Sequence, residues 1–350
     1  MNAQVVRGMG ESSPIALTQP LSAVNARTTG STRALVRPAT EKDIPRIVAL
    51  LKVALGDGST EKSEALWRWK HVDNPFGVSP VLVAEGDDEL IGVRAFMPWS
   101  WHLGGRTVSA VRAVDTATHP RHQGRGIFRQ LTMQLVDDCA ARYVGFIFNT
   151  PNRQSGPGYL KMGWSSLGRL PMCVRPVMGR RLASESTPPR ESLETALSHD
   201  AIDRLLASWA VDRDGMTTSV TRRYLRWRYL DYPSPTAEYA AVGNLEAHRP
   251  YLAILRTKAR LGFTEVRIVD FFALRGFDRR ECRARVARAV GVAGPVVMTW
   301  APQGRTPWPY QGLSGRMGPL VTVRPSNEGA PDGPRAFAWW QPSLGDMELF

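Results

Sequence analysis

The segment Thr116-Ala-Thr-His-Pro120-Arg-His-Gln123-Gly-Arg-Gly126-Ile-Phe128-Arg decides the fold of this chain. It joins residues 109–118, whose alternation predicts a strand, to a stretch in which apolar residues recur every four positions from Ile127 to Cys139, which predicts a helix. Glycines in such a turn let successive backbone N–H groups approach an anion, and the helix N-terminus adds the positive end of its dipole. The segment therefore predicts a pyrophosphate-binding turn in an α/β fold.

A second motif follows the next predicted strand, residues 143–148. It reads Asn149-Thr-Pro-Asn152-Arg-Gln-Ser155-Gly-Pro-Gly-Tyr159-Leu-Lys-Met-Gly163-Trp164. The first motif is not a dinucleotide-binding fingerprint, because the third glycine is missing, and it is not a Walker loop, because Gly-Lys-Ser/Thr is missing. Instead, the two motifs resemble those of the GNAT acyltransferase superfamily, Gln/Arg-x-x-Gly-x-Gly/Ala and Asn-x-x-Ala-x-x-x-Tyr-x-x-x-Gly-Phe. Phe128 departs from the first pattern, where the family usually has Gly or Ala.

The resemblance implies an acyl-CoA site on these two motifs. Backbone groups of Thr116 and Thr118 would hold the pantetheine arm, and amides from Gly124 to Phe128 would cradle the pyrophosphate. The residues expected to contact the cofactor are Thr116, Ala117, Thr118, Gln123, Gly124, Arg125, Gly126, Ile127, Phe128, Asn152 and Ser155. Arg121, Arg125 or Arg129 would reach the phosphates through charge-assisted hydrogen bonds.

Three residues are the catalytic candidates. By its place in the second motif, Tyr159 would protonate the departing thiolate; its alternative is a half-buried aromatic that caps a helix. Asp115 and His199 are candidates for the base that deprotonates the amine, since histidine titrates near neutral pH and Asp115 lies beside the loop. An alternating strand can equally turn Asp115 away, and His199 can equally be an exposed neighbour of a helix cap. Glu85 and the terminal carboxylate of Phe350 are further candidates for this base.

Two domains are expected. We predict a disordered extension over 1–33, a catalytic domain over 34–178, a Pro-rich linker over 179–198 and a second domain over 199–350. Within the first domain, Thr40 and Asp43 have capping-box spacing before an apolar stripe that starts at Ile44, which predicts a helix. Residues 81–96 read as a hairpin around an acidic turn.

An internal echo links the two halves. Leu66-Trp-Arg-Trp-Lys-His-Val-Asp-Asn-Pro75 returns as Leu225-Arg-Trp-Arg-Tyr-Leu-Asp-Tyr-Pro233, with Trp69 aligned on Trp227. A repeat of about 150 residues indicates a duplicated domain rather than a solenoid unit. Coincidence of aromatic and basic residues is the alternative. The second copy lacks the glycine turn after residues 265–272, so we expect it to be degenerate, to bind no CoA and to shape the acceptor site.

Aromatic residues crowd the C-terminal part. They could offer flat surfaces to a sugar or an aromatic acceptor, or they could simply be core. The residues concerned are Trp300, Trp308, Pro309, Tyr310, Trp339 and Trp340.

Composition excludes several other classes. Three cysteines without a CxxC pair argue against a disulfide or zinc scaffold. The net charge of +13 comes mostly from arginines spread along the chain, so nucleic acid is not expected as the main partner, and an anionic cofactor uses the same charge. No apolar run approaches the roughly 18 to 20 residues of a membrane span, and the start lacks a secretory signal. We expect a cytoplasmic protein.

The sequence therefore predicts an α/β protein of two tandem GNAT-like domains, each with a mixed central sheet flanked by helices, the second degenerate. The predicted activity is transfer of an acyl group from acetyl-CoA or acyl-CoA, without a metal, to the primary amine of a small molecule. Enzymes that acylate the amino sugar of teicoplanin-type glycopeptide antibiotics share this plan. The alternatives are a protein or aminoacyl-tRNA acceptor, or a CoA-binding regulatory protein without catalysis.

Overall fold

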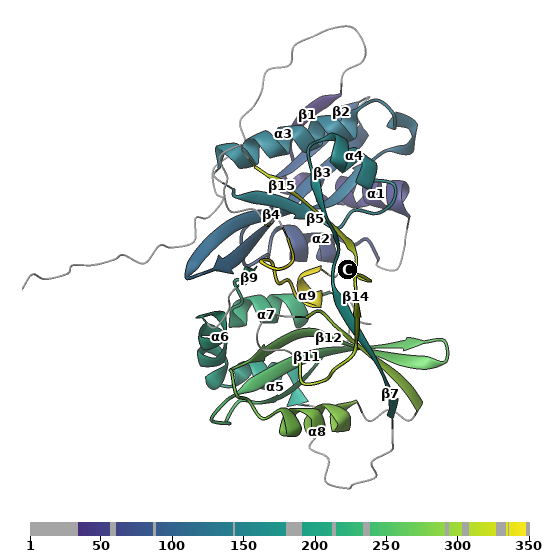
Figure 1. The fold of residues 1–350 in the computed structure, drawn as a ribbon. Coiled ribbons are helices and arrows are strands. Elements are labelled where there is room, and N and C mark those ends of the chain that lie inside the picture. Colours follow the sequence, from purple (N-terminus) through teal and green to yellow (C-terminus); the bar gives the residue numbers. More distant parts are fainter. Residues whose placement is uncertain are drawn as a thin grey trace, which may run out of the picture.

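The computed structural model describes residues 34–56, 61–86, 89–142, 144–179, 191–211, 215–233, 239–290, 294–302, 308–326, 334 and 336–347. They form two units, each a mixed sheet with helices on its faces (Figure 1). The predicted fold class, mixed α/β with two domains, is confirmed. The expected extension over 1–33 lies outside the described residues.

The first sheet has the strand order β1-β2-β3-β4-β5-β15-β6, with β9 added beside β3. Its neighbours are antiparallel except for the parallel pair β4–β5. The strands are β1 (Leu35–Pro38), β2 (Val81–Gly86), β3 (Glu89–Leu103), β4 (Arg106–Thr118), β5 (Phe146–Asn149), β6 (Ser165–Arg169), β9 (Thr217–Thr218) and β15 (Leu320–Pro325). The predicted hairpin is β2–β3.

Helices cover both faces of this sheet. They are η1 (Glu41–Asp43), α1 (Ile44–Leu55), α2 (Glu64–His71), η2 (Pro120–His122), α3 (Ile127–Ala141) and α4 (Gly156–Lys161). The Asp43 carboxylate accepts hydrogen bonds from the backbone N–H and the hydroxyl of Thr40, so the predicted helix starts there. The apolar stripe of α3 is buried against one face, with the ring of Tyr159 from α4, and α1 packs on the other.

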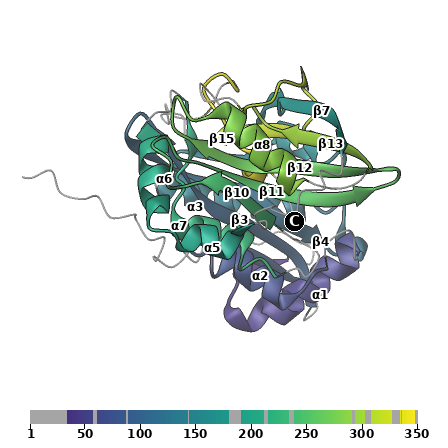
Figure 2. The ribbon, with the colours of Figure 1, turned by 90° about the horizontal axis from the view of Figure 1, so that it is seen from below.

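The second sheet has the strand order β14-β7-β13-β12-β11-β10-β8. Its strands are β7 (Met172–Gly179), β8 (Glu191–Ser192), β10 (Tyr239–Asn244), β11 (Tyr251–Arg260), β12 (Phe263–Ala273), β13 (Gly294–Trp300) and β14 (Leu313–Gly315). The helices of this half are α5 (Leu193–Ser198), α6 (Ala201–Val211), α7 (Arg222–Tyr229), α8 (Arg279–Ala289) and α9 (Leu344–Met347). Figure 2 shows the molecule from below, with α8 on the outer face of this sheet.

The two sheets agree in detail. Each contains one parallel pair, β4–β5 and β12–β13, at the same place in the strand order. Each sheet also has a bulge in the first strand of its parallel pair, in β4 of the first sheet and in β12 of the second. Asp115 is skipped between the pairs Arg94–Thr116 and Ala95–Val114, and Val269 is skipped between Ile254–Asp270 and Leu255–Ile268. Asp115 and Val269 therefore occupy equivalent positions.

The halves exchange one strand each. β7 follows the first half in sequence but pairs with β13 and β14 of the second sheet, whereas β15 lies between β5 and β6 of the first. Figure 1 shows β7 running down into the lower unit. The expected boundaries therefore differ from the structure: the change of sheet comes between β6 and β7, and residues 191–198, predicted as linker, form β8 and α5. A boundary read along the chain cannot show a strand exchange.

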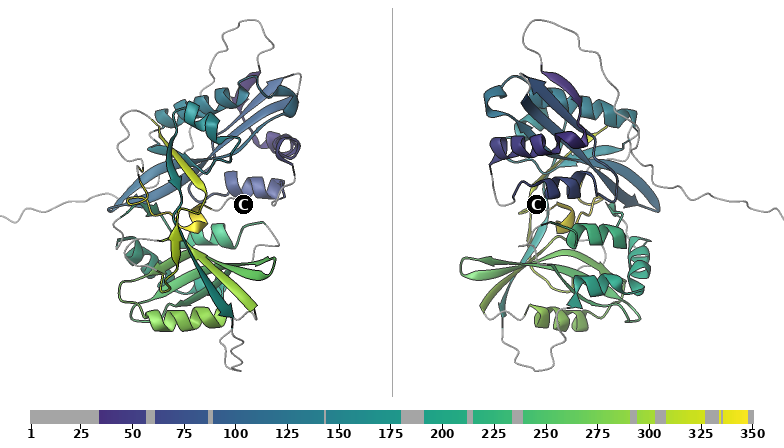
Figure 3. Two further views of the ribbon diagram at one scale, coloured as in Figure 1. Left: turned by 45° about the vertical axis from the view of Figure 1, so that its right-hand side comes forward. Right: turned by 180° about the vertical axis from the view of Figure 1, so that it is seen from behind.

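The units meet through α2 and α7, between the two sheets (Figure 3). The rings of Trp69 and Trp227 stack with centroids 4.6 Å apart. Each indole N–H donates to the other residue's carbonyl oxygen, at 2.7 and 2.8 Å. The two residues aligned by the internal echo thus make a reciprocal contact about a local pseudo-twofold axis.

The C-terminal turn α9 is buried in the same interface. Arg112 of β4 donates to the carbonyl oxygens of Asp346 and Met347, and Arg228 of α7 donates to that of Gly345. The Asp346 carboxylate accepts from Thr218 and Tyr224. Polar groups buried in this way fix how the two units dock, because each needs a partner from another segment.

Candidate active site

The parallel pair of the first sheet opens toward the glycine turn. β4 and β5 are paired only over Ala110–Arg112, so residues 113–118 of β4 continue without β5 beside them. This places the edge of Thr116, Ala117 and Thr118 next to the turn that follows β4. A strand edge without a partner presents N–H and C=O groups that a ligand amide can use. The predicted place for the pantetheine arm is therefore geometrically available.

The helix N-terminus beyond this edge is unoccupied by any side chain of the described chain. Gly126 is the N-cap of α3 with φ 78°, and no side chain caps the helix. Gly124 also has positive φ, and a Cβ on either glycine would meet no atom within 4 Å. Gln123 and Arg125 are exposed beside them, whereas Ile127 is buried under the helix. Free amides, open space and a helix dipole suit an anionic group such as a pyrophosphate.

Asn152 and Ser155 shape the start of α4. The Asn152 side-chain oxygen accepts from the backbone N–H groups of Gln154 and Ser155 and from the Ser155 hydroxyl, at 2.8 to 3.0 Å. Both residues are thus engaged with each other in forming the turn before α4. The helix has six residues, and glycines, which disfavour helix, occupy its first and third positions.

Tyr159 on α4 is 3% exposed, so it is more deeply buried than the half-buried, helix-capping aromatic that was the alternative. Its side of the sheet also holds Phe128, whose ring meets the Tyr159 ring edge-on at 5.6 Å. Phe128 fills the space between α3 and α4, where its ring approaches Gly158. Because Gly158 has no side chain, the large residue that departs from the family pattern fits here. The Tyr159 oxygen accepts a hydrogen bond of 2.6 Å from the Arg94 guanidinium.

Sequence reasoning missed Arg94. Its signal was a single charge inside the apolar run of residues 90–99, on a strand predicted to be buried. Lys70 and His71 were also missed, although both lie in the echoed segment.

Asp115 is turned toward α2, away from α3 and α4. Its carboxylate accepts from Lys70 Nζ at 2.9 Å and from His71 Nε2 at 2.9 Å, and His71 Nδ1 lies 2.9 Å from the Ser79 hydroxyl. Burial alone would raise the pKa of Asp115, but the Lys70 charge and the His71 hydrogen bond outweigh it and hold the pKa well below its usual range. A carboxylate held so strongly ionised is a weak base. With φ 40°, Asp115 instead shapes the bulge of β4.

The other candidate bases lie elsewhere. His199 is in the second unit, where its Nδ1 accepts from the N–H of Ala201 at the start of α6 and its Nε2 lies 3.8 Å from Glu246. The structure does not bring it to Tyr159, and the helix-cap alternative describes its place. Glu85 is paired with Arg37 and Arg46. Phe350 lies outside the described residues.

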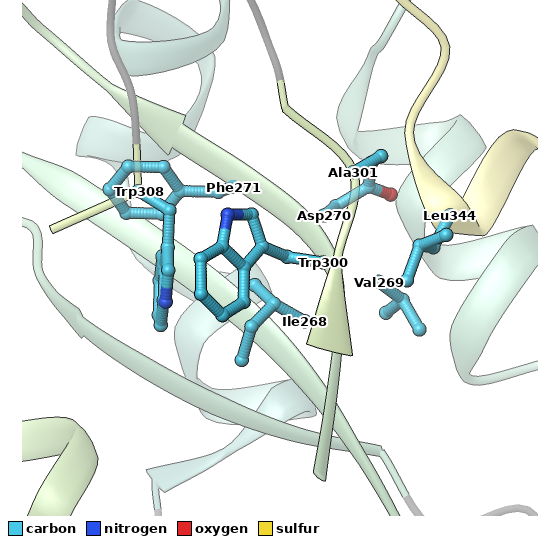
Figure 4. Close-up of a pocket in the computed structure, with 8 residues that line it drawn as sticks. All are labelled: Ile268, Val269, Asp270, Phe271, Trp300, Ala301, Trp308 and Leu344. Carbon is cyan, nitrogen blue, oxygen red and sulfur yellow. The ribbon is translucent and has the colours of Figure 1, made fainter. Parts of the chain in front are cut away.

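The equivalent region of the second unit is closed. β12 and β13 stay paired to Ile268, one residue before the bulge at Val269, whereas β4 and β5 part at Arg112, three residues before Asp115. Just beyond lies a small pocket walled by indole rings (Figure 4). It is lined by Ile268, Val269, Asp270, Phe271, Trp300, Ala301, Trp308 and Leu344. The Asp278 side chain accepts from the N–H groups of Arg280 and Glu281 and so caps α8.

Most of the aromatic cluster is core. Trp300, Trp308 and Trp340 are each at most 5% exposed, and only Trp339, at 67%, is an open tryptophan among those predicted for the acceptor surface. The core alternative is therefore correct for these three. Among the described residues, no group of His, Cys, Asp and Glu side chains could hold a metal ion. No helix in the described ranges is long and apolar enough to cross a membrane.

Comparisons with known proteins agree with this geometry. Residues 35–167 match the family model described as an acetyltransferase (GNAT) domain. The matched part contains the glycine turn, Asp115 and Tyr159. The match supports an N-acetyltransferase activity. A search of curated proteins finds no match to the sequence.

Solved structures extend the likeness to both units. A GCN5-related N-acetyltransferase from Anabaena variabilis aligns with TM-score 0.64 at 15% identity, covering 85% of this chain and 74% of that one. A protein from Enterococcus faecalis described as a probable N-acyltransferase gives 0.61 at 13%, covering 85% and 74%. A GCN5-related N-acetyltransferase from Kribbella flavida gives 0.54 at 13%, covering 84% and 72%. At these identities the likeness is one of fold.

Proposed function

We propose that the protein is an acyl-CoA-dependent N-acyltransferase that transfers an acetyl or longer acyl group to the primary amine of a small molecule. One observation carries the proposal: the opened β4–β5 pair leads to an uncapped helix N-terminus, with Tyr159 on the neighbouring helix. The amides of residues 124–128 would hold the pyrophosphate, and the free edge of β4 would hold the pantetheine arm.

Chemistry follows from the thioester that such a co-substrate supplies. A neutral amine would attack the carbonyl carbon directly, and Tyr159 would protonate the leaving thiolate. Asp115 holds the bulge of β4 in place from the other face of the sheet, through Lys70 and His71. Chain residues thus bind, align and donate a proton, and no covalent enzyme intermediate is required.

We further propose that the second unit is a degenerate copy that binds no acyl-CoA. The Asp278 carboxylate already caps the N-terminus of α8. The parallel strands β12 and β13 also stay paired for two residues longer, relative to the bulge, than β4 and β5. The unit packs on α2, next to Lys70 and His71, and so can support the catalytic sheet. As a degenerate copy without a cofactor role, the unit would contribute to the acceptor site. The resemblance implies an antibiotic amino sugar as one acceptor, so amino sugars belong in the amine panel.

The test is release of free thiol from acetyl-CoA and longer acyl-CoAs across a panel of amines, with isothermal calorimetry of CoA binding. We expect one CoA site per chain and amine-dependent thiol release. Tyr159→Phe should lower kcat by about 10² to 10⁴ with little change in CoA affinity, as expected for loss of a general acid. CoA binding without any thiol release would favour the regulatory alternative. Salt-dependent retention on RNA would favour an aminoacyl-tRNA acceptor.

A further inference from the structure

Arg94 carries a charge that the fold leaves without a counter-charge. Its side chain is completely buried, and no carboxylate among the described residues pairs with it. One nitrogen, Nη2, donates to the Tyr159 oxygen, while Nε and Nη1 have no hydrogen-bond partner in the described chain. Its other close neighbours are the rings of Phe96 and Phe128, at 4.9 and 5.7 Å from the guanidinium carbon.

Packing alone does not account for an arginine here. A buried donor without a partner is destabilising, and Arg94 has two such nitrogens. The second sheet shows that an apolar residue fits this place. Arg94 is paired beside the bulge at Asp115, and the residue in the same position beside Val269 is Ile254. The charged residue thus occurs in the sheet whose parallel strands part early, and not in the sheet whose parallel strands stay paired up to the bulge.

The hydrogen bond between Arg94 and Tyr159 has a fixed direction. A guanidinium has donors and no acceptor, so the phenolic oxygen must accept. The Tyr159 hydroxyl makes no other hydrogen bond with the described residues. Its own proton therefore points away from Arg94 and is free to be donated. A guanidinium 2.6 Å from that oxygen is also positioned to stabilise negative charge that develops on it during proton transfer.

We propose that Arg94 is a positioning residue that orients the Tyr159 hydroxyl and stabilises it as a phenolate during acyl transfer. This inference rests on the proposed function. The amine nitrogen forms a bond to the thioester carbon, the C–S bond breaks, and its electron pair goes to sulfur. Sulfur takes the Tyr159 proton, and the phenolate stays beside Arg94. The new amide nitrogen loses its extra proton to solvent, and the phenolate regains one from solvent.

A double-mutant cycle tests the proposal. Arg94→Met, Tyr159→Phe and the double variant are compared with the wild type for thiol release from acetyl-CoA, using the best amine of the panel. We expect Arg94→Met to lower kcat by about 10- to 100-fold, with KM changed less than about threefold. This loss is smaller than the roughly 10² to 10³ found for a donor that contacts the reacting atoms, because Arg94 acts through Tyr159. In the Tyr159→Phe background the same change should alter kcat less than about threefold, because its partner atom is gone.

A structural role gives different results. Equal losses of kcat in both backgrounds, or a loss confined to the affinity for CoA, would overturn the proposal. Thermal unfolding is measured for each variant, and we expect Arg94→Met to unfold no earlier than the wild type, since it removes a buried uncompensated charge. Arg94→Lys is carried through the same cycle. If the Met variant does not fold, the Lys variant decides by the same criterion.

The outcome also separates this inference from the proposed function. A wild type that binds CoA in calorimetry and releases thiol, with additive losses in the cycle, overturns the role of Arg94 alone. A wild type that neither binds CoA nor releases thiol overturns both.

Discussion

Helices α3 and α8 occupy the same place beside the parallel pair of their sheets, but their N-termini differ in charge. Gly126 leaves the α3 amides free, whereas the Asp278 carboxylate occupies those of α8. The strands beneath differ in the same sense, since β4 and β5 part earlier than β12 and β13. The same fold thus leaves a helix N-terminus free of side-chain caps in one unit and capped by a carboxylate in the other, and the strands beneath differ by two residues of pairing.

Because the two units exchange a strand, we predict that neither unit folds in isolation. Fragments 34–190 and 191–350 should each fail to fold alone, because the first lacks β15 and the second lacks β7. Mixed or co-expressed, they should form a complex with native circular dichroism, since the cut falls between β7 and β8. Circular dichroism and co-purification measure both outcomes, with the intact chain as control. A folded 34–190 fragment would show that β15 is dispensable.

Introducing an aspartate cap at the N-terminus of α3, as in α8, should weaken CoA binding. In Gly126→Asp, the new carboxylate lies where a pyrophosphate is expected, and two like charges about 4 Å apart cost about 1 to 4 kcal/mol outside a dry interior. CoA affinity in calorimetry should fall at least about tenfold relative to Gly126→Asn, because 1.4 kcal/mol corresponds to tenfold. Asn has nearly the same shape and tolerates the same positive φ, so it is the matched control. Equal affinities would place the phosphates elsewhere.

Asp115 tests whether the bulge residue is catalytic or structural. Asn tolerates a left-handed backbone, so Asp115→Asn should keep the bulge while losing the charge that holds Lys70. We expect thiol release to fall less than about tenfold, compared with about 10² to 10⁴ for loss of a general base. His199→Ala, in the second unit, should leave the rate unchanged. A hundredfold loss in the Asn variant with intact CoA binding would restore Asp115 as the base.

The smallest effect concerns the carboxylate beside the second bulge. Burial, with the charge of Asp346, raises the pKa of Asp270 from 3.8 to about 7. The folded state therefore binds this proton more tightly than the unfolded state, and the stability it contributes is lost as pH rises from about 4 through 7. His71 acts in the opposite sense, since burial lowers its pKa. The wild type must therefore be compared with a variant.

The melting temperature of Asp270→Asn, relative to wild type, should thus rise from pH 5 to pH 8, because only the wild type must ionise a buried acid. Calorimetry at four pH values measures the difference. Asp231→Asn, an exposed change in the same unit, should show no such trend. A constant difference for Asp270→Asn would mean that its carboxyl titrates normally in the folded protein.

The sequence by itself determined the elements near the first motif. Strand, glycine turn and helix were predicted at β4, Gly124–Gly126 and α3, because alternation, glycine and four-residue spacing are local signals. The correspondence of Trp69 with Trp227 could also be recognised in the sequence, since both copies of the repeat keep the tryptophan that stacks on its counterpart.

Only the tertiary structure decided which residues face one another. Strand exchange, the pairing of Asp115 with Lys70 and His71, and the contact of Arg94 with Tyr159 join positions 44 to more than 150 residues apart. No local pattern encodes such contacts, because a residue's type sets what it can bind and the packing of sheets and helices sets what it meets. His199 shows the converse: its chemistry suited a base, but the fold placed it at a helix cap.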